Sequence, residues 1–268
     1  MLEITGHADV THAAATVTFW NQRMRVHLYY VDGMLLDTGP SRLAGSLIPF
    51  FTDLPIRQVV LTHHHEDHTG LAPWLQRERQ LPVFIHERGR EHCLRKTSLP
   101  VYRKLFWGER DAFDPQLLPN RVETGRYCFD VLETPGHADD HVALYNRENG
   151  WLFAGDMFLT TRPKTMIRGE SVRAHVSSLR KLLRLDFDTL FCCHAGVVTE
   201  GKTRLAAKLA YLEELTDQVL DLAGRGLAER DIVRKLFPQP NLLTYLSGFE
   251  MSPHHIVRSI LHEKSDTP

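Results

Sequence analysis

The sequence predicts an α/β fold, and three observations support this prediction. Short apolar segments typical of buried strands alternate with segments of helical periodicity along the chain. Asp-Gly and Asn-Gly pairs, which favour tight turns, lie between apolar segments. The composition, with 43% hydrophobic and 24% charged residues in a chain of 268, is that of a globular protein that can bury a sizeable core. The length allows one or two domains.

The first 60 residues are expected to form short strands joined by turns. The expected elements are strands at 24–31 and 34–37, a helix from 41 to 51, and a buried strand at 56–62. Asp32-Gly33 is a hairpin signal, because glycine accepts the positive φ of a type I′ turn. Ser41 is expected to cap the helix. The strand at 56–62 ends where a cluster of histidines begins, which places chemically active side chains at a strand end.

The middle of the chain continues the alternation, with one interruption. The expected elements are a helix at 71–80, a strand at 83–86, helices at 87–96 and 101–107, strands at 127–132, 142–145 and 151–154, a helix at 171–183 capped by Ser171, and a strand at 189–193. Residues 87–120 break the strand-helix rhythm. They are predicted to form a helical insertion.

The carboxy-terminal part is predicted to be helical. Apolar residues recur at three- and four-residue steps through 203–223, which is typical of an amphipathic helix. Further helices are expected at 228–237 and 253–262, the latter with Ser252 as cap. We therefore expect residues 1–200 to form one domain and residues 201–268 a helical extension packed on it. The apolar stripe of 203–223 offers a face through which two copies of the chain can form a homodimer.

Charge and targeting signals narrow the class of protein. The formal net charge is −1, which argues against a basic field that attracts nucleic acid. The segment 1–7 lacks the basic and apolar regions of a secretory signal, and no apolar run reaches the roughly 20 residues that cross a bilayer. We expect a cytoplasmic protein with a small-molecule substrate and no membrane partner.

Seven residues carry the predicted chemistry. His63, His65, Asp67 and His68 form the pattern H-x-H-x-D-H directly after an apolar strand, and His137, Asp156 and His194 each follow a later strand. Imidazole and carboxylate groups suit zinc and neighbouring divalent metals. Five His and two Asp supply enough ligands for two ions of open coordination, joined by a carboxylate and a water-derived hydroxide.

These blocks, together with Leu35-Leu36-Asp37-Thr38-Gly39 upstream, resemble the metallo-β-lactamase fold superfamily in the branch typified by hydroxyacylglutathione hydrolase (glyoxalase II). The resemblance covers residues 16–200 and implies an αββα four-layer sandwich with a catalytic domain at 1–200. It assigns His63, His65 and His137 to the first metal, Asp67, His68 and His194 to the second, and Asp156 to both. It also implies that Asp37 accepts a hydrogen bond from a metal-bound histidine and that His141 lies near the metals.

Departures from relatives within this superfamily narrow the expected activity. Asp156 fills a bridging position that true β-lactamases generally leave without a carboxylate, which argues against antibiotic cleavage. His65 stands where redox members related to flavodiiron proteins generally have an acidic residue. The expected function is a dinuclear hydrolase in which a bridging hydroxide attacks a small thioester, ester or lactone, with Asp67 and Asp156 as catalytic residues. A phosphodiesterase or ribonuclease is the alternative.

The charge of the site and the variable segments bear on the cofactor and the substrate. Two divalent cations, two carboxylates and one hydroxide leave a net charge of about +1, which favours an anionic substrate. Zinc is the expected metal, and iron and manganese stay open. Basic and aromatic residues in 87–120 and 162–168 offer substrate contacts or form solvated helix faces. The resemblance also implies that the carboxy-terminal extension contributes to the substrate pocket, where His254-His255 would offer a further contact.

Overall fold

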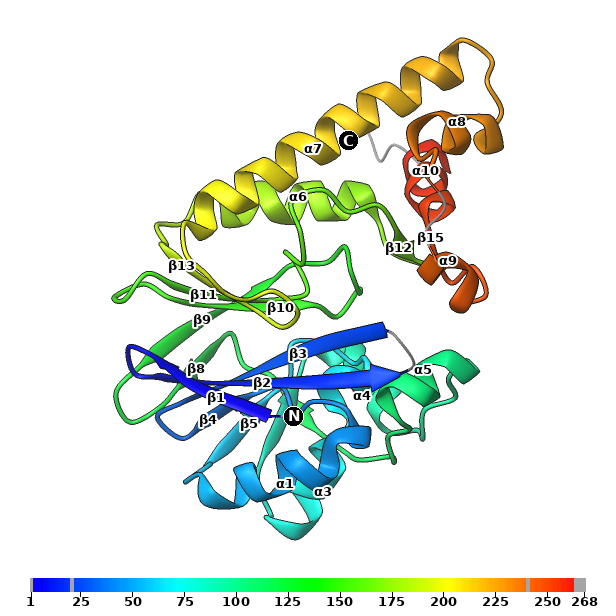
Figure 1. Cartoon of the computed structure of the whole chain (residues 1–268). Helices are drawn as coiled ribbons and strands as arrows, with labels where there is room; N and C mark the ends of the chain where they lie inside the picture. The colour runs from blue at the N-terminus through cyan, green and yellow to red at the C-terminus, as the bar shows by residue number, and fades with distance from the viewer. Residues whose placement is uncertain (1, 20–21, 240–241, 263–268) are drawn as a thin grey trace.

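The computed structural model describes residues 2–19, 22–239 and 242–262, and it consists of two β-sheets face to face with helices on both outer sides (Figure 1). The first sheet has the order β1 (Leu2–His7), β2 (Val10–Phe19), β3 (Gln22–Val31), β4 (Met34–Leu36), β5 (Gln58–Val60), β6 (Val83–Ile85) and β7 (Gln116–Leu117). The second has the order β14 (Gly196–Val198), β13 (Thr189–Cys192), β11 (Trp151–Gly155), β10 (Val142–Asn146), β9 (Cys128–Glu133) and β8 (Arg121–Glu123). This is the four-layer arrangement that the resemblance implies.

The first sheet changes from antiparallel to parallel pairing along its width. Strands β1 to β4 pair antiparallel, and β4 to β7 pair parallel. Asp32 and Gly33 both have positive φ, 46° and 91°, which confirms the type I′ turn between β3 and β4. Alternate side chains of β3 enter different cores: Val26 and Leu28 face the outer helices, and Tyr29 faces the second sheet.

The second sheet is buried on both faces. Phe129, Phe153 and Phe191 point toward the first sheet, where they join the inner core. Leu152 and Leu190 belong to the outer core beneath the helices. Strands β11 and β13 are parallel and fully buried, which explains why their sequences are continuous apolar runs without alternation.

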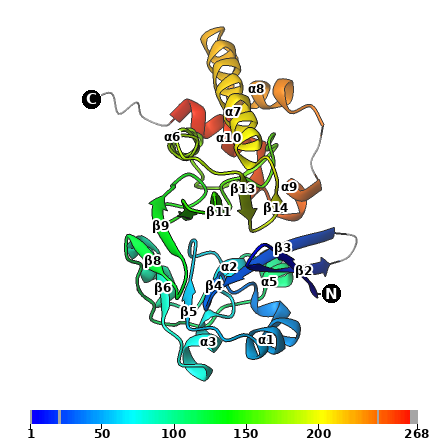
Figure 2. The ribbon, with the colours of Figure 1, turned by 90° about the vertical axis from the view of Figure 1, so that its left-hand side faces the viewer.

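Helices complete the two outer layers. Helices α1 (Ala44–Asp53) and α3 (Ala72–Glu78) cover the first sheet, and α6 (Val172–Leu182) and α7 (Gly201–Gly224) cover the second (Figures 1 and 2). Ser171 caps α6, because its hydroxyl accepts a hydrogen bond from the backbone N–H of Ala174, as expected. The apolar stripe of α7, including the buried Leu205, Leu212 and Val219, packs into the outer core of the same chain. That stripe is therefore not available as a dimer face.

The carboxy-terminal elements return toward the sheet edge. They are α8 (Glu229–Leu236), α9 (Leu242–Leu246), β15 (Met251–Ser252) and α10 (Pro253–His262), and α10 matches the predicted helix. Strand β15 pairs with β12 (Met166–Ile167), which lies in the segment between β11 and α6. This pairing ties the extension to the loop that follows Asp156.

Several predicted elements differ from the structure. Ser41 does not cap a helix: it begins a 3-10 turn (Ser41–Leu43), and its hydroxyl donates to the carbonyl of Glu109. Helix α4 (Glu87–Cys93) is shorter than expected, α5 (Val101–Trp107) matches, and the insertion also contributes β7 to the first sheet. Within residues 2–19, 22–239 and 242–262, no helix is both long and apolar enough to cross a membrane.

Candidate metal centre

Four loops at one edge of the sandwich bring the seven predicted ligands together. The histidine cluster follows β5 and continues into the short helix α2 (Glu66–Thr69). His137, Asp156 and His194 follow β9, β11 and β13. Each ligand candidate thus follows the carboxyl end of a strand, so the two sheets fix the positions of the loops from both sides.

Three histidines point ring nitrogen atoms at one spot. Nδ1 of His65 lies 3.0 Å from Nε2 of His63 and 3.0 Å from Nε2 of His137. Ligand atoms around a tetrahedral zinc ion with bonds of 2.0–2.1 Å are roughly 3.3 Å apart, which is close to this spacing. These three nitrogens can therefore hold one metal ion.

Asp67, His68 and His194 form a second group, and Asp156 lies between the two groups. Oδ2 of Asp67 is 3.2 Å from Nε2 of His194 and 3.8 Å from Nε2 of His68. Oδ2 of Asp156 is 3.5 Å from Nε2 of His68 and 3.3 Å from Nε2 of His194. The same oxygen is 3.4 Å from Nε2 of His137 in the first group. A carboxylate in this position can contact two ions at once.

Orphaned atoms and charge states test whether metal ions fit here. Nε2 of His68 and Oδ1 of Asp156 are buried without a hydrogen-bond partner. Burial lowers the pKa of His63 and of His65 well below the usual value, which keeps both rings in the neutral, metal-binding form. Burial alone would raise the pKa of Asp156, but the charges of His194 and His68 lower it well below its usual value. Burial alone would lower the pKa of His68, His137 and His194, but the surrounding carboxylates raise it, so this centre attracts positive charge. Two neutral imidazoles and a centre that attracts positive charge fit divalent cations.

The rings are also held from behind. Asp37 contacts Nδ1 of His68 at 2.8 Å through Oδ2, as the resemblance implies for a metal-bound histidine. The backbone carbonyl of Arg25 lies 2.7 Å from Nδ1 of His194. Oε1 of Glu170 is 3.4 Å from Nδ1 of His137. Such partners of Nδ1 fix the tautomer and orientation of a ligating ring, so that Nε2 of each ring points toward the centre.

His141 acts on the backbone of Asp156. Its Nδ1 lies 2.8 Å from the hydroxyl of Thr134, and its Nε2 accepts a hydrogen bond of 3.0 Å from the N–H of Asp156. Burial and the neighbouring His137 lower the pKa of His141 to about 3, so the ring stays neutral and can accept. Gly155 has a φ of 47°, and a Cβ there would lie 2.5 Å from Nε2 of His141. Glycine is needed at this position.

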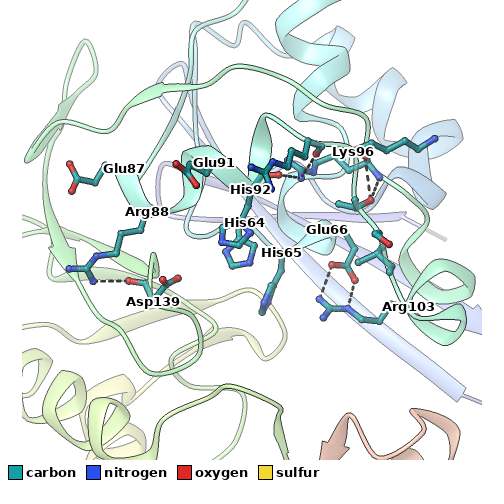
Figure 3. A pocket seen from close by; sticks show the side chains of 15 residues that line it. His64, His65, Glu66, Glu87, Arg88, Glu91, His92, Lys96, Arg103 and Asp139 are labelled. Carbon is teal, nitrogen blue, oxygen red and sulfur yellow. Dashed lines mark hydrogen bonds and ion pairs between the residues drawn. The ribbon is translucent and has the colours of Figure 1, made fainter.

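Glu66 lies between the ligand candidates His65 and Asp67, is 2% exposed and is ion-paired. Its carboxylate accepts hydrogen bonds of 2.6 and 2.7 Å from the guanidinium of Arg103 in α5 (Figure 3). A third nitrogen of Arg103 donates to Glu250 at 3.1 Å. Arg103 therefore connects the metal loop, the insertion and the carboxy-terminal segment.

Other histidines lie outside the ligand set. His64, between two ligands, contacts Oδ1 of Asp140 at 2.8 Å. His254 pairs with Glu229, and Nε2 of His255 contacts the carbonyl of Phe249. A cavity lies next to the metal centre, and neither His254 nor His255 lines it.

The supporting roles of three residues were not predicted: Glu170 and Lys208 were missed, and Arg103 was only one of the basic residues of 87–120 that offered substrate contacts. Lys208 is 3% exposed and donates to the carbonyls of Met157 and Phe158, just after Asp156, at 2.6 and 3.1 Å. Burial lowers the pKa of Lys208 to about 8. The one available signal is a lysine on the apolar face of the amphipathic helix, three residues after Leu205. The other two carry no spacing signal.

Comparisons with known proteins identify the family and the fold of the chain. The family model described as Metallo-beta-lactamase superfamily matches residues 27–194, a segment that contains all seven ligand candidates. A hydroxyacylglutathione hydrolase from Hahella chejuensis is 28% identical, with 80% of this chain and 76% of that protein covered. An atrochrysone carboxyl ACP thioesterase from Claviceps purpurea is 26% identical, with 74% of this chain and 56% of that protein covered. A solved structure of a β-lactamase domain protein from Burkholderia ambifaria, 18% identical, has a TM-score of 0.71 and covers 97% of this chain and 87% of its own.

Proposed function

The chain belongs to the metallo-β-lactamase superfamily and is a metal-dependent hydrolase, and we propose that it uses two divalent ions to hydrolyse a small thioester, with esters and lactones as related substrates. The main support is the arrangement of seven ligand side chains in two groups that share one oxygen of Asp156. The names of two relatives support the thioester, because hydroxyacylglutathione and acyl-ACP are both acyl thioesters.

The proposed roles follow from the contacts. His63, His65 and His137 would hold one ion, Asp67, His68 and His194 would hold the other, and Asp156 would contribute to both. Asp37 orients His68 from behind, and His141 fixes the backbone of Asp156. Asp67 and Asp156 are the proposed catalytic carboxylates, because each lies beside Nε2 of both His68 and His194.

When bound, two such ions supply hydroxide at neutral pH and polarise the substrate carbonyl. The overall reaction forms a C–O bond, breaks the C–S bond and releases an acid and a thiol. We propose that Asp67, beside Nε2 of His194, would orient the attacking oxygen. We propose zinc as the native metal and the cytoplasm as the location. We also propose residues 1–200 as the catalytic domain and 201–268 as an extension packed on it.

Metal analysis and a substrate panel test this proposal. We expect two metal ions per chain, loss of activity with a chelator, and its return with zinc. The panel contains a thioester, an ester, an acyl lactone, a phosphodiester and a short RNA, and the thioester should give the highest kcat/KM. A large preference for the phosphodiester or the RNA would establish the alternative of a phosphodiesterase or ribonuclease.

A further inference from the structure

The hollow beside the metal centre has mostly apolar walls. It encloses about 360 Å³, within the range of small-molecule sites, and five of the seven ligand candidates line it. Its apolar side chains come from separate parts of the chain: Tyr102, Phe106 and Trp107 from α5, Phe158 from the loop after β11, Ile167 from β12, and Leu243 from α9. Helix α5 belongs to the insertion and α9 to the carboxy-terminal extension. The insertion and the extension thus both contribute to one surface next to the proposed metal ligands.

A second hollow lies near the Glu66–Arg103 pair and has a different character. It encloses about 750 Å³ and is lined mainly by charged and polar side chains, among them Arg88, Glu91 and Asp139 (Figure 3). Of the seven ligand candidates, only His65 lines it. A substrate group that reaches Asp156 therefore enters through the apolar hollow.

The cations that line the apolar hollow are either occupied or exposed. Arg103 is bound to Glu66 and Glu250, and the ammonium of Lys208 donates to two backbone carbonyls. Arg25 and Lys164 also line the hollow, and both are exposed. Among the described lining residues, the buried cations thus already have partners, while the exposed ones can reach a charged group outside.

We propose that the apolar hollow binds the acyl chain of the substrate, so that the substrate class is a thioester with an apolar acyl group. This inference rests on the proposed thioester hydrolysis and makes it more specific. In this arrangement the acyl chain of the substrate packs against Phe106, Trp107 and Leu243. The carbonyl carbon of the thioester lies at the metal centre. The polar thiol carrier stays at the entrance, near Arg25 and Lys164. A short polar acyl group would leave the apolar walls without a partner.

A chain-length series tests the inference. Acetyl, butyryl, hexanoyl and octanoyl thioesters of N-acetylcysteamine are compared with S-lactoylglutathione, using the metal-loaded full chain. Because each buried methylene favours binding by about threefold to fourfold, kcat/KM should rise by that factor per methylene until the hollow is filled. A flat or falling series, or preference for S-lactoylglutathione, would overturn the inference.

Two neighbouring leucines provide a matched pair of variants. Leu243 lines the hollow, whereas Leu242 is 59% exposed and does not line it. Leu243→Arg should lower kcat/KM for the hexanoyl thioester at least tenfold and flatten the series. Leu242→Arg should keep the wild-type series. Equal effects of the two substitutions, with unchanged thermal unfolding, would contradict the proposed position of the acyl chain.

Binding of the product acids separates this inference from the proposed function. Isothermal titration calorimetry with acetate, butyrate, hexanoate and octanoate needs no turnover. Tighter binding with chain length, without cleavage of any thioester, would refute the proposed function and support the hollow as an acyl site. Thioester cleavage without any dependence on chain length would support the function and refute the acyl site.

Discussion

The metal centre and the cover of the apolar hollow are built in different ways. The proposed ligands lie at the ends of strands in two broad sheets, and His68, His137 and His194 each have a second contact behind the ring. The cover consists of short elements, with seven residues in α5, five in α9 and two in β15. Arg103 links this cover to the metal loop. The two sheets therefore fix the positions of the side chains that carry the chemistry. Short elements shape the substrate site, and these elements can change without disturbing the sheets.

The largest effect is expected inside the metal centre. Asp156→Asn removes the carboxylate that lies between the two groups of histidines. We expect kcat to fall by roughly a thousandfold or more, because the metal-generated nucleophile is lost, while the fold remains. Metal analysis, turnover and circular dichroism check this. Asp130→Asn, which alters a surface pair with Arg121, should be silent. Retained activity with full metal content would refute the role of Asp156.

The next largest effect is expected at Arg103, which links the metal centre to the short elements that cover the apolar hollow. Arg103→Met leaves Glu66 buried and unpaired, which should cost about 3–5 kcal/mol in the free energy of unfolding. The double variant with Glu66→Gln should recover part of this loss. Lys104→Met breaks only a surface pair with Glu109 and should cost less than about 1 kcal/mol. Urea unfolding measures all three, and similar losses at positions 103 and 104 would show that the link is weak.

Lys208 connects the extension to the loop after Asp156 and gives a pH-dependent test. Its pKa is about 8 in the folded chain and 10.5 when unperturbed, so the unfolded chain binds more protons between these pH values. The free energy of unfolding should therefore rise with pH over this window, by about 3 kcal/mol from this group. Lys208→Met should lack this rise. Parallel pH curves for wild type and variant, measured by urea unfolding, would contradict it.

The smallest effect concerns a partner behind a ligand. Glu170→Gln removes the charge opposite Nδ1 of His137, and losses of this kind lower metal affinity or activity by about 10- to 100-fold. Chelator competition measures the affinity. Glu133→Gln, at an exposed glutamate, serves as the control. An unchanged affinity in Glu170→Gln would show that the backbone alone orients His137.

The two regions also differ in how well the sequence predicts them. The ligand set is local in sequence, since four of seven residues occur within positions 63–68 directly after a strand that periodicity identifies. Helices α5 and α10 were predicted at their observed bounds because each has an apolar period, and α10 also has a start signal in Ser252 and Pro253. Glu170 and Arg103 could not be predicted, because their partners lie 33 and 37 residues away and depend on the fold.

Strands were predicted less completely than helices. Strands β1 and β2 were missed, since their residues mix small and polar side chains and the pairing partner, not the local pattern, makes them strands. Strands β7, β12 and β15 were also missed, because each has only two residues and shows no local pattern. The cover of the hollow consists partly of such elements, so its shape follows from tertiary contacts alone.

The ligand loops come from both sheets, and this has a mechanical consequence. His63, His65, Asp67 and His68 follow a strand of the first sheet, while His137, Asp156 and His194 follow strands of the second. Ions held by these residues act as cross-links between the two halves of the sandwich. Part of the metal-binding free energy is then folding free energy, and the melting temperature should rise with metal concentration. The same atoms would hold the molecule together and carry out its reaction.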